Sequence, residues 1–355
     1  MTKSLVTTTI VFAALLPFLP SPSAFAGPIA ASYAVSAATG LELQSYSAVN
    51  GDIYSGGAAT LDFGYGIQVP SFTGNVKSIG NLSIGLLSDL TGNVNTDGSL
   101  TLASDDDLTG NAIYGTTLSV GSSGSSISGT ASHQANSVQS AALPLPTIFS
   151  PGTTKVTATN NLSLSPGSYG DVTESSDFDT VALSSGNYYL KSLSLNSSDT
   201  FAFNIVNNEP INIYSQGNIS IASGLNIVVN GVSYTSPTSG VNNALARLVT
   251  FETDGNFSNP EGFLNYFFGS IYAPDGNINM QFDYMEGQLI AGGNITGTGY
   301  VDYQPSARLL AAPVPEPTAG ALFGLGLLSL CVCRRNWLAR LKTLGPDAQA
   351  CQKRL

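Results

Sequence analysis

Residues 72–75 read Phe-Thr-Gly-Asn, and Leu-Thr-Gly-Asn follows at 90–93 and again at 108–111. Each copy begins 18 residues after the previous one. A second series keeps this spacing, with apolar–hydroxyl–apolar triplets at residues 82–84, 100–102 and 118–120. Such triplets alternate between two faces, as short strands do. Two series with one period predict an all-β fold, a parallel β-helix (β-solenoid) with about 18 residues per coil.

In such a fold, residues at equal phase stack on successive coils. Apolar residues then form inner columns, while Ser, Thr and Asn face solvent. We expect the Gly-Asn pairs at the corners, where positive φ angles are needed, and stacked Asn side chains can form amide ladders. Only 10% of the residues are charged. The geometry explains this, because like charges about 4.8 Å apart on neighbouring coils repel.

The pattern changes in the middle of the chain. Residues 122–140 are rich in Ser and Gly, and Leu143-Pro144-Leu145-Pro146 is typical of a linker or crossover. Strands are predicted again from about residue 156, at 181–183, 188–195, 201–206, 211–214 and 225–229. A Gly-Asn-apolar-polar motif recurs at 217–220, 276–279 and 293–296. We therefore expect a second β-helical segment, with a β-sandwich as the alternative.

The N-terminus has the three parts of a secretory signal. Lys3 supplies positive charge, residues 5–19 are mostly apolar, and Ala24 and Ala26 give the small-x-small site for signal peptidase. The exported body from residue 27 contains no Cys, because the three cysteines all lie after residue 330. Disulfides therefore cannot stabilise the body.

The C-terminus consists of three adjoining segments. They are Val314-Pro315-Glu316-Pro317, an apolar run over residues 319–333, and the pair Arg334-Arg335. This arrangement resembles the PEP-CTERM sorting signal of Gram-negative bacteria. The resemblance implies transient retention in the inner membrane by a transmembrane helix, cleavage near Pro-Glu-Pro by exosortase, and display at the cell surface or release. The Arg pair would orient the helix with its tail in the cytoplasm. An ordinary C-terminal anchor is the alternative.

These features predict six parts of the chain. They are a signal peptide with its helix (1–26), a first solenoid segment (27–142), a linker or crossover (143–155), a second β-helical segment (156–312), the sorting signal (313–335) and a cytoplasmic tail (336–355). The second segment resembles the β-helical ectodomains of bactofilin-like and choice-of-anchor surface proteins. The residues that carry this likeness are 183–189 and 269–274.

The composition offers little for catalysis. The net charge of −11 disfavours nucleic acid as a partner. His133 is the only histidine, and no patterned nucleophile lies beside it, so a surface-loop role is expected. Asp105-Asp106-Asp107 is the densest acidic run, and the stretch 93–98 resembles the start of a calcium loop but has Ser104 where an EF-hand needs Glu. We expect no cofactor and no metal, and calcium binding near this run is left open.

Two further groups bear on function. Asp171, Glu174, Asp177 and Asp179 form a second acidic cluster that a glycosidase or lyase could use, but few basic partners accompany it. The aromatics at 188–189, 266–268 and 272 either stack on carbohydrate or fill the core. By resemblance, we expect a non-enzymatic surface protein with a structural or adhesive role in exopolysaccharide, biofilm or floc. A polysaccharide-degrading enzyme on the same scaffold is the alternative.

Overall fold

The computed structural model describes residues 30–44, 47–62, 71–85, 88–222, 224–259 and 266–311. The predicted signal peptide, with Ala24 and Ala26, lies outside this described part. The predicted sorting signal and its transmembrane helix lie outside it too. Within the described part, no helix is long and apolar enough to cross a membrane.

The first half forms coils of three short strands each. The first coil consists of β1 (Val35–Ala37), β2 (Gly40–Leu43) and β3 (Ala48–Asn50), after the 3₁₀ helix η3 (Ala30–Ser32). The following strands are β4 (Ile53–Ser55), β5 (Ala59–Leu61), β6 (Ser71–Thr73), β7 (Val76–Ser78), β8 (Leu82–Ile84), β9 (Asp89–Thr91), β10 (Val94–Thr96), β11 (Leu100–Leu102), β12 (Asp107–Thr109), β13 (Ala112–Tyr114), β14 (Leu118–Val120), β15 (Ser126–Ile127) and β16 (Ala131–His133).

The second half is also coiled, with longer strands. Its strands are β17 (Val156–Ala158), β18 (Leu162–Leu164), β19 (Gly167–Ser168), β20 (Asp171–Glu174), β21 (Thr180–Ser184), β22 (Gly186–Leu190), β23 (Ser192–Leu195), β24 (Thr200–Asn204), β25 (Ile211–Ser215), β26 (Ile219–Ile221), β27 (Asn226–Val229), β28 (Val232–Tyr234), β29 (Val249–Thr253), β30 (Phe257–Asn259), β31 (Tyr266–Phe268), β32 (Ser270–Ala273), β33 (Ile278–Gly287), β34 (Leu289–Ala291) and β35 (Asn294–Tyr303). The helices are η4 (Asn243–Leu248) and α1 (Ala307–Ala311).

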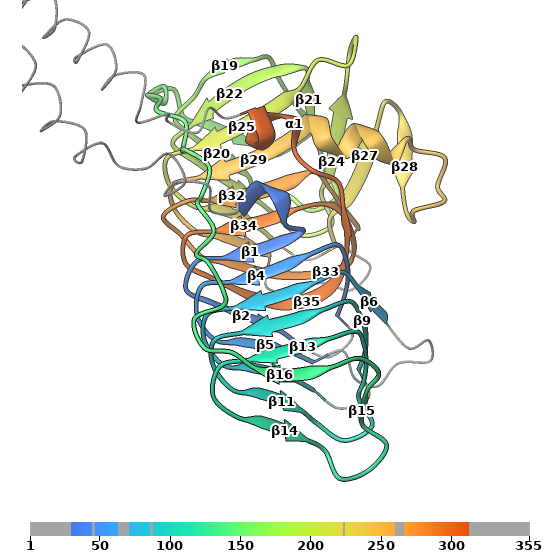
Figure 1. The fold of residues 1–355 in the computed structure, drawn as a ribbon. Coiled ribbons are helices and arrows are strands. Elements are labelled where there is room, and N and C mark those ends of the chain that lie inside the picture. The colour runs from blue at the N-terminus through green and yellow to red at the C-terminus, as the bar shows by residue number, and fades with distance from the viewer. Residues whose placement is uncertain are drawn as a thin grey trace, which may run out of the picture. The chain divides into compact units, whose positions relative to one another are not determined.

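The coils do not stack in chain order. A 12-stranded sheet takes one strand from each coil, in the order β16-β13-β10-β7-β4-β1-β34-β32-β29-β25-β22-β19. The chain therefore starts in the middle of the stack, coils to one end, returns along the outside, and coils from the other end back to the middle (Figure 1). There β34 pairs with β1, and β35 pairs with both β2 and β3.

The predicted β-solenoid is confirmed. The pairings between described strands are parallel, apart from the hairpin β27–β28, so the β-sandwich alternative is wrong. The 18-residue step sets the register, since Val94 pairs with Val76 on one side and with Ala112 on the other. These side chains are buried and form one of the inner columns. The same step aligns Leu100 with Leu82 and Leu118.

In the first half, glycine and asparagine share the two roles that were expected of the Gly-Asn corners; in the second half the expectation of positive φ was wrong, since Gly217, Gly276 and Gly293 do not adopt it. Gly92 takes the positive φ, +149°, and a Cβ there would lie 1.7 Å from the carbonyl oxygen of Gly74 on the next coil. The Asn after each glycine has an ordinary φ and forms the ladder instead. The Asn93 backbone and side-chain amides both donate to Asn75 Oδ1, each at 3.1 Å, and Asn111 repeats this on Asn93.

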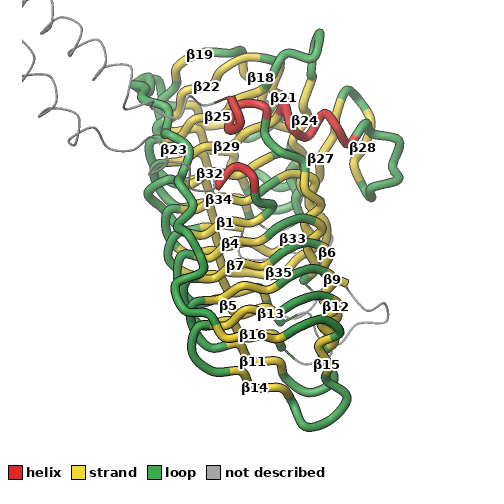
Figure 2. The backbone as a smooth tube through the Cα atoms, in the orientation of Figure 1, coloured by secondary structure: helices red, strands yellow, loops and turns green. Residues whose placement is uncertain are grey.

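Residues 134–155, named the strap here, form the return connection along the outer face of the 12-stranded sheet (Figure 2). Asp97 Oδ1 accepts hydrogen bonds from the backbone N–H of Ser137 and Val138, at 2.6 and 3.0 Å. Further along, Ala142 O accepts from Ala30 N at 2.8 Å. The strap, η3 and α1 enclose a second small core on this face, formed by Ala30, Ala31, Tyr272, Ile290 and Leu309.

Candidate functional site

The most extensive regular surface feature is a row on the 18-stranded sheet, named the polar column here. It takes one outward-facing side chain from each coil and continues through the junction of the two halves. In stacking order it consists of Thr157, Thr173, Ser194, Ser220, Ser258, Asn279, Thr296, Glu42, Thr60, Ser83, Thr101 and Ser119. Glu42 is the single charged member, and none of the twelve is buried.

The polar column keeps its hydrogen-bonding groups available. Among the described residues, one side chain of the column makes a hydrogen bond: Glu42 accepts from Gln44 Nε2 at 3.3 Å. The eleven Ser, Thr and Asn side chains make none with other described residues. Parallel coils repeat about every 4.8 Å, so the column is a linear array of free hydroxyl and amide groups at that spacing.

An asparagine ladder runs beside part of the polar column. Asn256 N donates to Asn218 Oδ1 at 2.9 Å, and Asn277 and then Asn294 continue the series at 2.8 Å. Column and ladder together border a shallow groove of about 370 Å³, lined by Asn218, Ser220, Asn256, Phe257, Ser258, Asn277 and Asn279. The groove is neutral and rich in amides.

A different cluster lies on the outward side of β33 and β35, where Asn243 and Tyr234 contact it. Tyr284 and Tyr300 are stacked in register, with ring centroids 4.8 Å apart. The Tyr284 hydroxyl lies 3.0 Å from Glu286 Oε1 and 2.9 Å from Asp302 Oδ2. Asn243 Nδ2 donates to Glu286 Oε1 at 2.6 Å, and Asn50 Nδ2 donates to Asp302 Oδ1 at 2.8 Å.

This cluster has an unusual charge balance. Burial, followed by the nearby Asp302 charge, raises the pKa of the Glu286 carboxyl to about 7, against hydrogen bonds from Tyr284 and Gln304. Burial and the two carboxylates also raise the pKa of the Tyr284 hydroxyl. The ion pairs within the described part, Lys191–Asp171 and Arg308–Glu252, involve other carboxylates.

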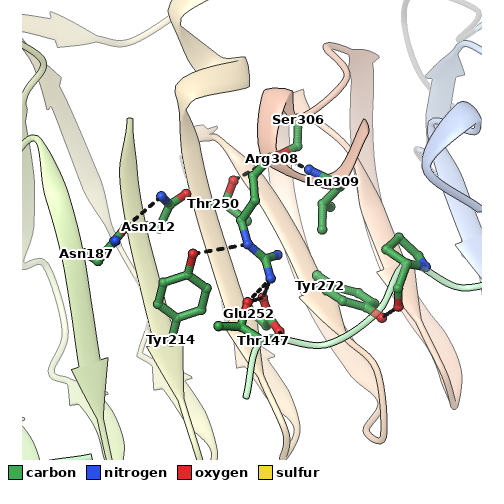
Figure 3. A network of polar contacts seen from close by, with 11 residues as sticks. Thr147, Asn187, Asn212, Tyr214, Thr250, Glu252, Tyr272, Ser306, Arg308 and Leu309 are labelled. Carbon is green, nitrogen blue, oxygen red and sulfur yellow. Dashed lines mark hydrogen bonds and ion pairs between the residues drawn. The ribbon is translucent and has the colours of Figure 1, made fainter. Parts of the chain in front are cut away.

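A second buried glutamate, Glu252, lies on the strap-covered face and is paired (Figure 3). Arg308 forms a salt bridge with Glu252 and donates from Nε to the Tyr214 hydroxyl at 3.1 Å. Glu252 also accepts from Thr147 N of the strap at 2.5 Å. Burial raises the pKa of Glu252, and the Arg308 charge opposes that shift. This network, named the clasp here, ties the strap and the last described helix to the sheet.

His133 is at the surface, as expected, but it lies in a strand and not in a loop: it is exposed in β16, the end strand of the 12-stranded sheet. Its Nε2 lies 2.9 Å from the Gly115 carbonyl oxygen, and its ring packs edge-on against Tyr114. Its position at the end of the stack is separate from the polar column and from Glu286.

The acidic run at 105–107 is split by the corner it occupies. Asp105 has a φ of +62° and is exposed, whereas Asp106 is buried and accepts from Ser88 N at 2.9 Å. Burial raises the pKa of Asp106 to about 6. Asp107 is exposed and accepts from Ser126 Oγ at 2.6 Å. The three carboxylates therefore lie in three different environments.

The loop that resembles a calcium site has structural contacts. Asn93 belongs to the corner ladder, as its place in the repeat predicted. Asn95 Oδ1 accepts from Ser137 Oγ at 2.6 Å, and Asp97 accepts from the strap backbone. The described residues contain no group of three His, Cys, Asp or Glu side chains arranged to hold a metal ion.

The second acidic cluster also separates in the structure. Asp171 faces solvent, pairs with Lys191 and accepts from Ser192 Oγ at 2.8 Å. Glu174 is buried and accepts from the backbone N–H groups of Ser175 and Ser176. Asp177 is exposed and Asp179 is half-buried. The buried partner that the sequence did not reveal is Asp199, whose pKa burial raises to about 6.

The aromatic residues proposed for carbohydrate stacking are mostly enclosed. Tyr188, Phe267 and Phe268 are buried, and Tyr272 lies beneath the strap with its hydroxyl bonded to the Pro144 carbonyl. Tyr189 stacks on Tyr214 with centroids 5.3 Å apart, and Phe149 of the strap packs against both. These residues do not form an exposed strip.

The sequence does contain a signal for the Tyr284 cluster. Tyr284-Met285-Glu286 and Tyr300-Val301-Asp302 repeat an aromatic-apolar-acidic triplet 16 residues apart. The alternation places Met285 and Val301 inside, so both Tyr and both acidic residues face outward on paired strands. The shorter step conceals this pair from a search for 18-residue repeats.

Comparison with known proteins identifies the C-terminal segment. Residues 313–335 match the model of the PEP-CTERM protein-sorting motif. The motif marks the chain as an exported, exosortase-targeted surface protein. No curated protein sequence matches the chain. A crystal structure of an ice binding protein from an Antarctic bacterium Flavobacteriaceae is similar over 77% of this chain and 82% of that chain, with 13% identity and a TM-score of 0.28. That likeness is too distant to carry a functional argument.

Proposed function

We propose that this protein is a structural or adhesive component of an extracellular polysaccharide matrix, and that the polar column is its binding face. The single observation that carries the proposal is the continuity of the column through both halves of the stack. Eleven of its twelve positions are small, uncharged hydrogen-bonding residues without partners in the described part of the chain. A long and repeating surface suits a long, repeating ligand.

The chemistry of the column favours a neutral, extended glycan. Hydroxyl and amide groups exchange hydrogen bonds with sugar hydroxyls, and each such bond contributes only about 0.5–1.5 kcal/mol. A row of weak contacts becomes strong through multivalency along one polymer. The net charge of −11 and the presence of Glu42 disfavour an anionic polysaccharide.

A cell-based experiment tests this function. A strain that lacks the gene is complemented with the native gene or with the column variant Ser83→Lys/Thr101→Lys. The matched control is Thr91→Lys/Thr109→Lys, on the neighbouring strands β9 and β12 of the same sheet. Matrix imaging and an aggregation assay should show rescue by the native and control genes, and loss of rescue for the column variant. Unchanged matrix and aggregation after gene deletion would refute the proposed role.

A polysaccharide-degrading enzyme is the second candidate, because Glu286 and Asp302 form a close carboxylate pair. Both lie within 3.0 Å of one hydroxyl oxygen, so their nearest oxygens are at most about 6 Å apart, a limit that includes the separation of about 5–5.5 Å in retaining glycosidases. The Glu286 side chain is buried, however, and this supports binding over cleavage. Release of reducing ends from a glycan, abolished by Asp302→Asn, would reverse the preference.

A further inference from the structure

Glu286 is a buried carboxylate whose charge balance is incomplete. It is 0% exposed, and its Oε2 atom has no partner in hydrogen-bonding geometry among the described residues. The buried Glu252 differs, because Arg308 pairs with it. Burying a carboxylate without a cation or a full set of donors is costly. Neither salt bridge of the described residues involves Glu286, so no cation among them balances its charge.

Two side-chain amides, those of Asn243 and Gln304, donate to Glu286, and the other polar groups beside it are the Asp302 carboxylate and the Tyr284 and Tyr234 hydroxyls. Asp302 Oδ2 and Glu286 Oε1 flank the Tyr284 hydroxyl at 2.9 and 3.0 Å. Asn243 reaches Glu286 Oε1 through Nδ2, which leaves its own buried Oδ1 without a described partner. The buried Tyr234 hydroxyl also lacks one, and its ring contacts that of Tyr284 with centroids 6.4 Å apart.

This donor set has the chemistry of a hard-cation site. Ca²⁺ prefers oxygen ligands from carboxylates, amide carbonyls and hydroxyls, and accepts irregular geometry. We propose that Glu286 and Asp302 bind Ca²⁺, with the Asn243 amide oxygen as a further ligand. Extracellular calcium modules commonly bind at roughly 0.1–1 mM, and an exported protein meets such concentrations.

The position of the site gives the cation a structural role. Asp302 is held by Asn50 of the first coil, and Asn243 belongs to residues 230–248, which leave the coil between β27 and β29. Glu286 and Asp302 themselves lie on the paired strands β33 and β35. A bound cation would therefore join the first coil, the last coils and the excursion at the junction of the two halves.

Terbium luminescence tests the site directly. Tb³⁺ replaces Ca²⁺ at oxygen sites and emits when a nearby tyrosine is excited, and the Tyr284 hydroxyl lies within 3.0 Å of both carboxylates. The purified full-length chain in detergent is titrated with Tb³⁺ and then with Ca²⁺ or Mg²⁺. We expect saturable emission that Ca²⁺ displaces, together with a melting temperature that EGTA lowers.

Variants separate this site from surface acids. Asp302→Asn should reduce the emission at least fivefold, and Glu286→Gln should do the same if the variant melts cooperatively. The control Asp89→Asn/Asp107→Asn neutralises the exposed pair on neighbouring coils and should leave the emission unchanged. Emission that persists in Asp302→Asn, or its absence in the native chain, would overturn the proposal. The polysaccharide assays do not depend on this result.

Discussion

The two large sheets of this solenoid present contrasting outer faces. The 12-stranded sheet carries large outward residues such as Tyr214, Glu252, Tyr272 and Ile290, and the strap, η3 and α1 lie over them. The polar column of the 18-stranded sheet carries small hydroxyl and amide side chains without such partners. The size and polarity of the outward residues thus distinguish a face built to be covered by the chain itself from a face left to solvent.

The largest expected effect comes from opening the covered face at the clasp. Arg308→Ala leaves Glu252 buried without its cation, and breaking such a pair costs about 3–5 kcal/mol. We expect a loss of this size in the free energy of unfolding, measured by urea denaturation. Arg247→Ala, which removes an exposed arginine, is the control. Equal stability of the Arg308 and Arg247 variants would contradict the role of the clasp.

The next effect concerns the corner that joins the two faces. Gly92→Ala places a Cβ 1.7 Å from the Gly74 carbonyl at a φ of +149°, so we expect a loss of about 2–4 kcal/mol from strain and clash together. Gly231→Ala is the control for backbone strain alone, because φ is +81° there and no atom lies within 4 Å of the added Cβ. It should lower the free energy of unfolding by about 1–2 kcal/mol. Equal losses in the free energy of unfolding for both variants would show that the close contact between coils is not what requires glycine at position 92.

A smaller effect appears in the pH dependence of stability. Burial raises the pKa of Asp106 and Asp199 to about 6, from 3.8. The native state therefore binds more protons than the unfolded state between pH 4 and 6, and these groups make stability fall as pH rises through that window and then level off. Melting temperatures should therefore fall between pH 4 and 6, and Glu286, with a pKa of about 7, should extend a shallower fall to about pH 7. Asp106→Asn/Asp199→Asn should reduce the slope between pH 4 and 6; an unchanged slope there would show that neither residue is responsible.

The smallest effects on stability come from single substitutions of outward residues, one on each of the two faces. Thr101→Val on the polar column should change the free energy of unfolding by less than about 0.5 kcal/mol, because the residue is exposed. Ile290→Val beneath the strap and α1 should cost about 0.5–1.5 kcal/mol, because the residue is buried. Chemical denaturation measures both. A larger loss at Thr101 than at Ile290 would invert the comparison.

Local sequence patterns predicted the elements of this fold well. The 18-residue step fixed the register of Val76, Val94 and Ala112, and the six strands predicted for the second half each begin within two residues of an observed strand. The prediction of one strand over residues 188–195 was wrong, because the chain turns a corner at Lys191 between β22 and β23. These features depend on backbone periodicity and on the alternation of side chains, which a sequence displays directly. The glycine and asparagine corners are local for the same reason.

The order of the coils was not accessible in this way. The pairing of β1 with β34 joins Val35 to Leu289, and no periodic signal links residues so far apart. The clasp likewise brings Thr147, Glu252 and Arg308 together from separate segments. The polar column depends on this stacking order, because Thr296 meets Glu42 only where the last coil meets the first. Its continuity therefore became visible only in the structure.

The central claim is that the polar column binds a neutral glycan, and co-sedimentation of the full-length chain with microcrystalline cellulose tests it most directly. Ser83→Lys/Thr101→Lys should weaken binding at least tenfold. Thr91→Lys/Thr109→Lys adds the same charge to the same coils on the neighbouring strands β9 and β12 and should bind like the native chain. Equal binding by both variants, or binding lost only in this control variant, would contradict the claim.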